Sequence, residues 1–154
     1  MRHQHLVQVN DLANPHIQRL TRNQLWQGLV LRAREPQRFM EQLDDAQIVA
    51  EGEGWLRREM RFGSLLVIDL IEFEHEKLVR YQTQAGADHG GGLLLMQIEE
   101  PEAGALFVRF SYDTPHEVPD SEQHLLAYVR QAWQDTDVAT ISLIRLLAQE
   151  GLLG

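Results

Sequence analysis

An arginine and an aspartate that face each other across a predicted β-hairpin are the residues of this sequence best placed to do chemistry. The segment "WLRREMRFGSLLVIDLIEF" contains the pair Gly63-Ser64, and glycine in the first central position is what a two-residue type II′ turn requires. This turn places Arg58 directly opposite Asp69, on a face that is otherwise apolar. Directly opposed residues have Cβ atoms within about 5.5 Å of each other, so an ion pair forms easily there.

Two interpretations of this pair remain open. Buried ion pairs seldom add net stability, because desolvation offsets the attraction between the charges. A functional interpretation is therefore that Arg58 anchors a carboxylate or phenolate of a ligand and that Asp69 holds the arginine in place. In the structural interpretation the pair lies at the end of the sheet, reaches solvent and has no further role.

Three aromatic residues are further candidates for contact with a ligand. Tyr81 and Tyr112 lie on predicted apolar strands, and the alternation on the last strand predicts that Tyr112 points inward, where its hydroxyl needs a partner. Trp133 lies on the face of a predicted C-terminal helix. Core packing is the alternative role for all three residues. Spacing alone does not show whether Tyr81 or Arg80 shares the face of Asp69.

Other kinds of site have weak support in the sequence. The glycines of "QAGADHGGGLLLMQIEE" predict a connection between strands, because a phosphate-binding loop needs a following helix and usually Lys and Ser or Thr. His89 in this loop is a candidate ligand contact. His3 and His5 can share one strand face, but no further zinc ligand accompanies them. The chain has no cysteine and no G-x-S-x-G serine, so we expect no metal and no cofactor and name no catalytic residue.

The composition narrows the class of partner. The 154 residues, 44% hydrophobic and 24% charged, fit one domain over residues 1–154. The net charge of −9 argues against nucleic acid as a partner, because nucleic-acid binding needs a basic surface. The sequence shows neither the apolar core of a signal peptide nor a run of the roughly 18 apolar residues that span a membrane. We therefore expect a cytoplasmic protein without a membrane partner.

The first third of the chain predicts one strand and two helices. Residues 5–11 alternate and predict a strand. Thr21 and Gln24 have the spacing of a capping box at the start of a helix, and this helix should end before Pro36. A second short helix should begin at that proline. The apolar residues assigned to it are Phe39, Met40 and Leu43.

Strands and one long helix make up the rest of the chain. Six strand-like segments bounded by turn residues cover residues 46–53, 55–62, 65–73, 77–84, 92–100 and 105–112. A helix over residues 121–149, about 43 Å long at the standard rise, has a face formed by Leu125, Val129, Ala132, Thr136, Thr140, Leu143 and Leu147. Because sequential strands usually pair with their neighbours, this order predicts an α+β fold. A curved antiparallel sheet carries the long helix across one face, with a cavity between them.

Several segments resemble a known family. They are "LTRNQLWQGLVLRAREPQRFM", "RREMRFG", "FVRFSYD", "AYVRQAW", "LIRLL" and "EGLLG". In the same order and over nearly the whole chain, they are similar to a START-like family of bacterial and fungal proteins that includes the AtaL-like protein of acetylaranotin biosynthesis. The resemblance implies a helix-grip fold of the START-like (SRPBCC) superfamily, in which a curved sheet wraps a long C-terminal helix around a hydrophobic cavity. It carries over no pocket residue, and likeness of fold alone does not establish an activity.

Three functions are compatible with these predictions. The first is binding of a small hydrophobic or aromatic metabolite in the cavity, with Arg58 and Asp69 as polar anchors. The second is a polyketide cyclase- or isomerase-like enzyme that orients a reactive ligand in the same cavity. The third is a structural or interaction protein, for example a homodimer, whose interior is filled by its own side chains. A cavity on the order of a few hundred Å³ with at least two inward polar groups would favour the first two functions.

Overall fold

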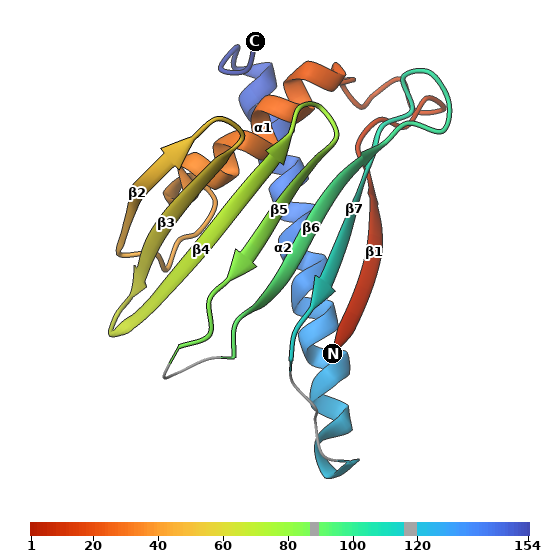
Figure 1. The fold of residues 1–154 in the computed structure, drawn as a ribbon. Helices are drawn as coiled ribbons and strands as arrows, with labels where there is room; N and C mark the ends of the chain where they lie inside the picture. Colours follow the sequence, from red (N-terminus) through yellow and green to blue (C-terminus); the bar gives the residue numbers. More distant parts are fainter. Residues whose placement is uncertain (87–89, 116–119) are drawn as a thin grey trace.

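A seven-stranded antiparallel sheet and a long C-terminal helix form the computed structural model of the chain (Figure 1). The structure describes residues 1–86, 90–115 and 120–154. The elements are β1 (Arg2–Gln8), α1 (Arg22–Arg34), η1 (Pro36–Arg38), β2 (Asp45–Gly52), β3 (Trp55–Phe62), β4 (Leu65–Glu74), β5 (Leu78–Thr83), β6 (Gly92–Glu99), β7 (Phe107–Asp113), η2 (Asp120–Glu122) and α2 (Gln123–Gln149). The strand order is β1-β7-β6-β5-β4-β3-β2, so the N-terminal strand forms one edge. This is the α+β helix-grip arrangement that the sequence predicts.

The β3–β4 hairpin has the register that its turn requires. Gly63 has a φ of +61°, and the φ of Ser64 is not positive. These values fit a type II′ turn, whose first central residue alone has a positive φ. Arg58 pairs with Asp69 in the ladder, as predicted.

The β4–β5 ladder places Tyr81 on the same face of the sheet as Asp69. Tyr81 pairs with Ile71, and Thr83 pairs with Asp69. Residues two apart on a strand face the same side, so Arg80 faces the opposite side. Tyr81 and Asp69 are both buried, and their face is the concave one, against which α1 and α2 lie (Figure 1).

Helix α1 begins and ends where the sequence predicts. The Thr21 hydroxyl accepts from the Gln24 amide, and the side chain of Gln24 accepts from the Thr21 amide, which completes a capping box. Glu35, the residue before a proline, ends the helix. Gly28 lets α1 approach α2 closely, because a Cβ atom there would lie 2.4 Å from Cγ2 of Ile144.

Helix α2 is anchored by its C-terminal half. The helix is continuous, and its backbone approaches those of α1 and β1 most closely. Its buried residues all lie in the second half: Asp137, Thr140, Ile141, Ile144, Leu147 and Ala148. The N-terminal end of the helix projects beyond the ends of the neighbouring strands (Figure 1), and Leu125 and Val129 in the first half are 47% and 37% exposed. The predicted packing of the apolar face against the sheet therefore covers only part of the helix.

Two predicted boundaries are wrong. The first strand is Arg2–Gln8 instead of residues 5–11, because its ladder with β7 continues back to Arg2. The backbone amides of Val9 and Asn10 both donate to the carbonyl oxygen of Leu106, and this irregular pairing ends the strand. The predicted second helix is only the single turn η1, which is capped by Phe39. The chain enters the sheet soon afterwards, where the amide of Asp44 bonds to β3.

The glycine-rich segment connects two neighbouring antiparallel strands, as predicted. β5 ends at Thr83 and β6 begins at Gly92, so no helix follows the glycines. Gly91 has a φ of +74°, and a Cβ atom there would lie 2.5 Å from the carbonyl oxygen of Thr83, so this position requires glycine. His89 lies outside the described residues.

Candidate functional site

The concave side of the molecule buries several charged side chains between the sheet and the two helices. Arg32 on α1, Arg58 on β3, Asp69 on β4 and Asp137 on α2 are all buried. Charged side chains are seldom fully buried unless they are paired. The partners of each charge therefore indicate whether it stabilises the fold or is available to a ligand.

Arg58 and Asp69 form a buried ion pair that is satisfied within the protein. Both Nε and Nη2 of Arg58 lie 3.0 Å from Oδ2 of Asp69, and the Thr83 hydroxyl donates to Oδ1 at 2.6 Å. Nη1 of Arg58 donates to the carbonyls of Arg32 and Ala33, which lie at the end of α1 and lack partners within the helix. These contacts tie α1 to the sheet and favour a structural role. The expectation that such a structural pair reaches solvent is wrong, because both side chains are buried. The ligand-anchoring role of the pair stays a prediction.

Arg32 is a buried cation without an ionic partner. It is 6% exposed, and among the described residues its Nε has no hydrogen-bond acceptor. No carboxylate in the described part of the chain forms an ion pair with it. The two buried carboxylates, Asp69 and Asp137, pair with Arg58 and His5. Burial lowers the pKa of Arg32, but Tyr81, Tyr112 and Asp137 together outweigh burial and raise the pKa, so the side chain stays charged. Sequence reasoning missed this residue, although its position three residues after Leu29 on the apolar stripe of α1 was a visible signal.

Tyr81 presents a second buried polar atom without a partner. It is 3% exposed, and its hydroxyl makes no hydrogen bond to any described residue. The guanidinium groups of Arg32 and Arg58 each lie 5.2 Å from the centroid of its ring, within cation–π range. The hydroxyl is near enough to raise the pKa of Arg32, yet no hydrogen-bonding geometry joins the two groups. An unsatisfied buried hydroxyl costs about 1–3 kcal/mol, so this hydroxyl is available to a bound molecule.

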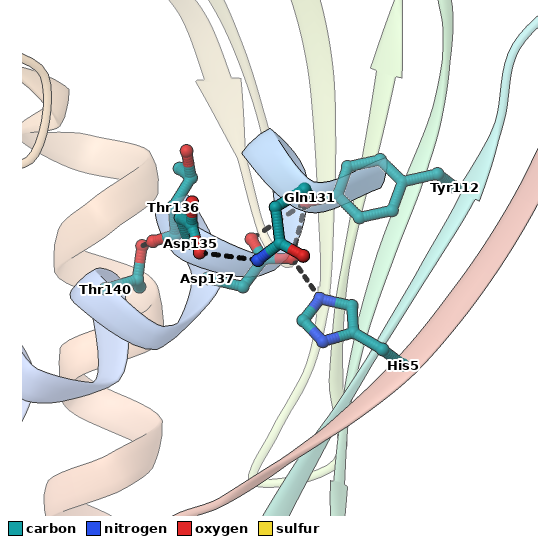
Figure 2. Close-up of polar contacts among 7 residues, drawn as sticks. All are labelled: His5, Tyr112, Gln131, Asp135, Thr136, Asp137 and Thr140. Carbon is teal, nitrogen blue, oxygen red and sulfur yellow. Dashed lines mark hydrogen bonds and ion pairs between the residues drawn. The ribbon is translucent and has the colours of Figure 1, made fainter. Parts of the chain in front are cut away.

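Asp137 joins α2 to the sheet through short hydrogen bonds (Figure 2). The Tyr112 hydroxyl lies 2.8 and 2.7 Å from its two carboxylate oxygens, and Nε2 of His5 lies 2.6 Å from Oδ2. Burial raises the pKa of Asp137, while the hydrogen bonds from His5 and Tyr112 act in the opposite direction. Burial, followed by the charge of Asp137, raises the pKa of Tyr112 far above its usual value. Tyr112 therefore remains a neutral hydrogen-bond donor.

Aromatic rings cover this carboxylate. The rings of Trp133 and Tyr112 stack with centroids 4.2 Å apart and 1° between their planes. His3 stacks on His5 at 5.6 Å and on Trp133 at 5.9 Å. Burial, followed by the charges of His5 and Arg130, lowers the pKa of His3, so this imidazole is neutral near pH 7. Tyr112 points inward, as the alternation on its strand predicts.

The two groups of predicted residues lie in one region of the concave face. Leu94 links them, because it pairs with Tyr81 on one side and with Tyr112 on the other. The two groups also interact through charge, because Asp137 raises the pKa of Arg32 and Arg32 acts to lower the pKa of Asp137. We call the following residues the concave polar cluster: His5, Arg32, Tyr81, Tyr112 and Asp137. Of these five residues, only the two tyrosines were predicted from the sequence as ligand contacts, and His5 was considered only as a metal ligand.

Several surface pockets lie outside this region. One of about 580 Å³ lies against the outer side of α1, and its lining includes Trp26, Val30, Ile48 and Leu153. Two of about 460 Å³ are lined mainly by residues of the convex face. One of about 240 Å³ lies between η1 and β2, and Arg58 forms part of its wall. The internal cavity between the sheet and α2 stays a prediction.

Two further kinds of site have no support in the described part of the chain. Within residues 1–86, 90–115 and 120–154, no three His, Asp or Glu side chains are grouped so that they can hold a metal ion. No helix in the described part of the chain is long and apolar enough to cross a membrane.

One family model matches almost the whole chain. It covers residues 7–151 and is described as AtaL, acetylaranotin biosynthesis cluster protein L. No curated protein matches the chain in sequence.

Solved structures with low sequence identity share the fold. The di-domain aromatase/cyclase StfQ from the steffimycin biosynthetic pathway has a TM-score of 0.69 at 9% identity, over 97% of this chain and 50% of StfQ. The ZhuI aromatase/cyclase from Streptomyces sp. R1128 has a TM-score of 0.66 at 13% identity, over 96% of this chain and 95% of ZhuI. The Aha1 dimer from Colwellia psychrerythraea has a TM-score of 0.64 at 15% identity, over 94% and 96% of the two chains. At these identities the likeness establishes the helix-grip fold and nothing about a ligand.

Proposed function

The chain belongs to the AtaL family, and from that premise we propose that it binds a small hydrophobic or aromatic metabolite between the concave face of the sheet and α2. The observation that carries this proposal is the buried Tyr81 hydroxyl, which has no hydrogen-bond partner among the described residues. Around it the concave face supplies an apolar wall that includes Ile71, Leu94, Met96 and Phe110. Binding sites for small molecules typically combine such a wall with a few convergent polar groups. The two aromatase/cyclases among the structural neighbours add support for a role in handling a metabolite.

Two adjacent leucines on β6 provide a matched test of this location. Leu94 faces the concave side and pairs with Tyr81, whereas Leu95 pairs with Arg80 on the convex side. Tryptophan at position 94 would fill the proposed site, and tryptophan at position 95 adds the same volume outside it.

Native mass spectrometry after incubation with a cell metabolite extract provides the readout. We expect the wild type and Leu95→Trp to carry a discrete added mass that is lost on denaturation, and Leu94→Trp to carry none while it remains folded. Retention of the added mass by Leu94→Trp would contradict the location. Unfolding of Leu94→Trp would show that the interior is already filled, and a wild type that takes up no mass would contradict binding itself.

A polyketide cyclase- or isomerase-like enzyme that uses the same site is the second candidate function. It is favoured by the contact of His5 with Asp137 at 2.6 Å, because a carboxylate-oriented imidazole is well suited to general acid–base catalysis. Among the described residues, Nδ1 of His5 has no hydrogen-bond partner. We expect the wild type to convert the metabolite found by native mass spectrometry into a product that liquid chromatography separates from it, and His5→Gln to bind the metabolite and leave it unconverted. A wild type that leaves the bound molecule unchanged would exclude this candidate.

A second copy of the chain is the other partner that we propose, with α2 as the contact. Leu125, Tyr128 and Val129 are 47%, 79% and 37% exposed, and their spacing places them on one face of the helix. Exposed apolar patches mark interaction sites, and one structural neighbour is described as a dimer. Light scattering should give the mass of a dimer for the wild type and of a monomer for the double variant Leu125→Glu, Val129→Glu. A monomeric wild type would contradict this proposal.

A further inference from the structure

We propose that the metabolite held between the sheet and α2 carries a carboxylate, and that Arg32 and Tyr81 together recognise it. This inference rests on the proposed binding function and adds the chemical class of the ligand. It depends on which buried charges the protein pairs with one another and which one it leaves without an ionic partner.

The buried acids near Arg32 are engaged by other residues. Asp69 accepts hydrogen bonds from Arg58 and Thr83. Asp137 contacts His5 and Tyr112, and it acts on Arg32 only from beyond ion-pair distance.

Arg32 therefore enters the interior without a carboxylate of its own. An isolated buried ion is costly, and the cost falls when an opposite charge with hydrogen-bonding atoms lies beside it. A neutral carbonyl or hydroxyl would satisfy a donor and leave this charge uncompensated. The ligand group that fits the charge is an anion.

The donors that lack partners suit a carboxylate in particular. Nε of Arg32 and the hydroxyl of Tyr81 are both buried without acceptors among the described residues, and the guanidinium lies 5.2 Å from the centre of the tyrosine ring. A carboxylate offers two oxygens that accept from several donors at once, and arginine matches its planar geometry. Arg58 is fixed by its bonds to Asp69 and α1 and lies against the same ring, so it holds Tyr81 in position.

A second arginine on the same helix provides a matched control. Arg34 lies two residues after Arg32, but its side chain is 42% exposed and pairs with Glu51 on the surface. Arg34 also lines the pocket on the outer side of α1. A ligand bound in that outer pocket would therefore depend on Arg34, whereas a ligand bound on the concave side would depend on Arg32.

The experiment measures the affinities of three probes of similar shape: 2-naphthoate, 2-naphthamide and 2-naphthol. Calorimetric titration near pH 7 is carried out with the wild type, Arg32→Met, Arg32→Lys and Arg34→Met. We expect the wild type to bind 2-naphthoate at least about tenfold more tightly than 2-naphthamide, as expected for a hydrogen bond to a charged group. Arg32→Met should lower the affinity for 2-naphthoate by at least about tenfold and change the affinity for 2-naphthamide by less than about threefold. Arg32→Lys should retain part of the preference, and Arg34→Met should retain all of it.

Other outcomes would overturn the inference in distinguishable ways. Equal affinities for 2-naphthoate and 2-naphthamide, or an equal loss of both in Arg32→Met, would overturn the carboxylate and leave the binding function intact. Tighter binding of 2-naphthol than of 2-naphthoate would replace the carboxylate by a phenol. Loss of 2-naphthoate binding in Arg34→Met would indicate that the site lies on the outer side of α1. A wild type that binds none of the probes would overturn the proposed function as well. If Arg32→Met does not fold, a reduced preference for 2-naphthoate in Arg32→Lys supports the inference, and an unchanged preference overturns it.

Discussion

Two buried arginines contact the same tyrosine ring but have different surroundings. Arg58 and Arg32 each lie 5.2 Å from the centre of the Tyr81 ring. Arg58 donates to Asp69 and to two carbonyls of α1, whereas Nε of Arg32 has no acceptor among the described residues. Removal of the paired arginine is expected to destabilise the fold, because it leaves Asp69 without its partner. The unpaired arginine is expected to serve binding at some cost in stability.

Substitution of the two arginines by methionine should therefore affect stability differently. Arg58→Met should lower the free energy of unfolding by about 3–5 kcal/mol, because it leaves Asp69 as an uncompensated buried charge. Arg32→Met should leave the free energy of unfolding unchanged or raise it by about 1 kcal/mol, because it removes a buried charge that has no ion-pair partner. Chemical denaturation of both variants measures the difference. Similar losses of stability in the two variants would contradict the distinction.

The lowered pKa of His3 predicts a dependence of stability on pH. The folded protein binds a proton at this imidazole less readily than the unfolded chain, whose histidine has a pKa of 6.5. The stability that His3 contributes is therefore present above pH 6.5 and is lost as the pH falls through 6.5 toward the folded pKa. We expect the free energy of unfolding to fall between about pH 7.5 and pH 5, and to fall less in His3→Phe. Other groups that face His3, such as His5, Arg130 and Asp137, are present in both proteins, so an equal fall in both would rule out this role.

At the scale of elements, the site depends on the close crossing of α1 and α2. Arg32 reaches the interior from α1 and Asp137 reaches it from α2, so the spacing between these helices sets the position of the concave polar cluster. The helices meet at Gly28, which has no room for a Cβ atom beside Ile144.

Gly28→Ala tests this crossing. Alanine in place of glycine within a helix usually stabilises it by about 1 kcal/mol. At this position the added methyl group would lie 2.4 Å from Cγ2 of Ile144, so we expect a loss of about 1–3 kcal/mol from overpacking. Urea denaturation measures the sign of the change, and a gain in stability would show that the helices are not in tight contact there.

Features of the fold that depend on short sequence motifs could be predicted from the sequence. The Gly63-Ser64 turn set the register of β3 and β4, and the spacing of Thr21 and Gln24 set the start of α1. The roles of the arginines could not be predicted, because the carbonyl partners of Arg58 come from α1, a distant segment of the chain. The exposure of the first half of α2 could not be predicted either, because the spacing of its apolar residues does not depend on whether a strand packs against them.

At the scale of the whole molecule, the arrangement leaves one face of the sheet only partly engaged by the long helix. The backbone of α2 approaches those of α1 and β1 most closely, and the concave polar cluster lies between the helices and the strands. The fold of this chain thus places buried donors opposite an apolar wall, and the proposed function depends on a ligand that occupies this region.

Intermolecular nuclear Overhauser effects test that location most directly. The protein with isotope-labelled methyl groups is studied in complex with 2-naphthoate. We predict contacts from the aromatic protons of the probe to the methyl groups of Ile71 and Leu94 on the concave face. Contacts to Val30 and Leu153, which line the pocket on the outer side of α1, would contradict the proposed site.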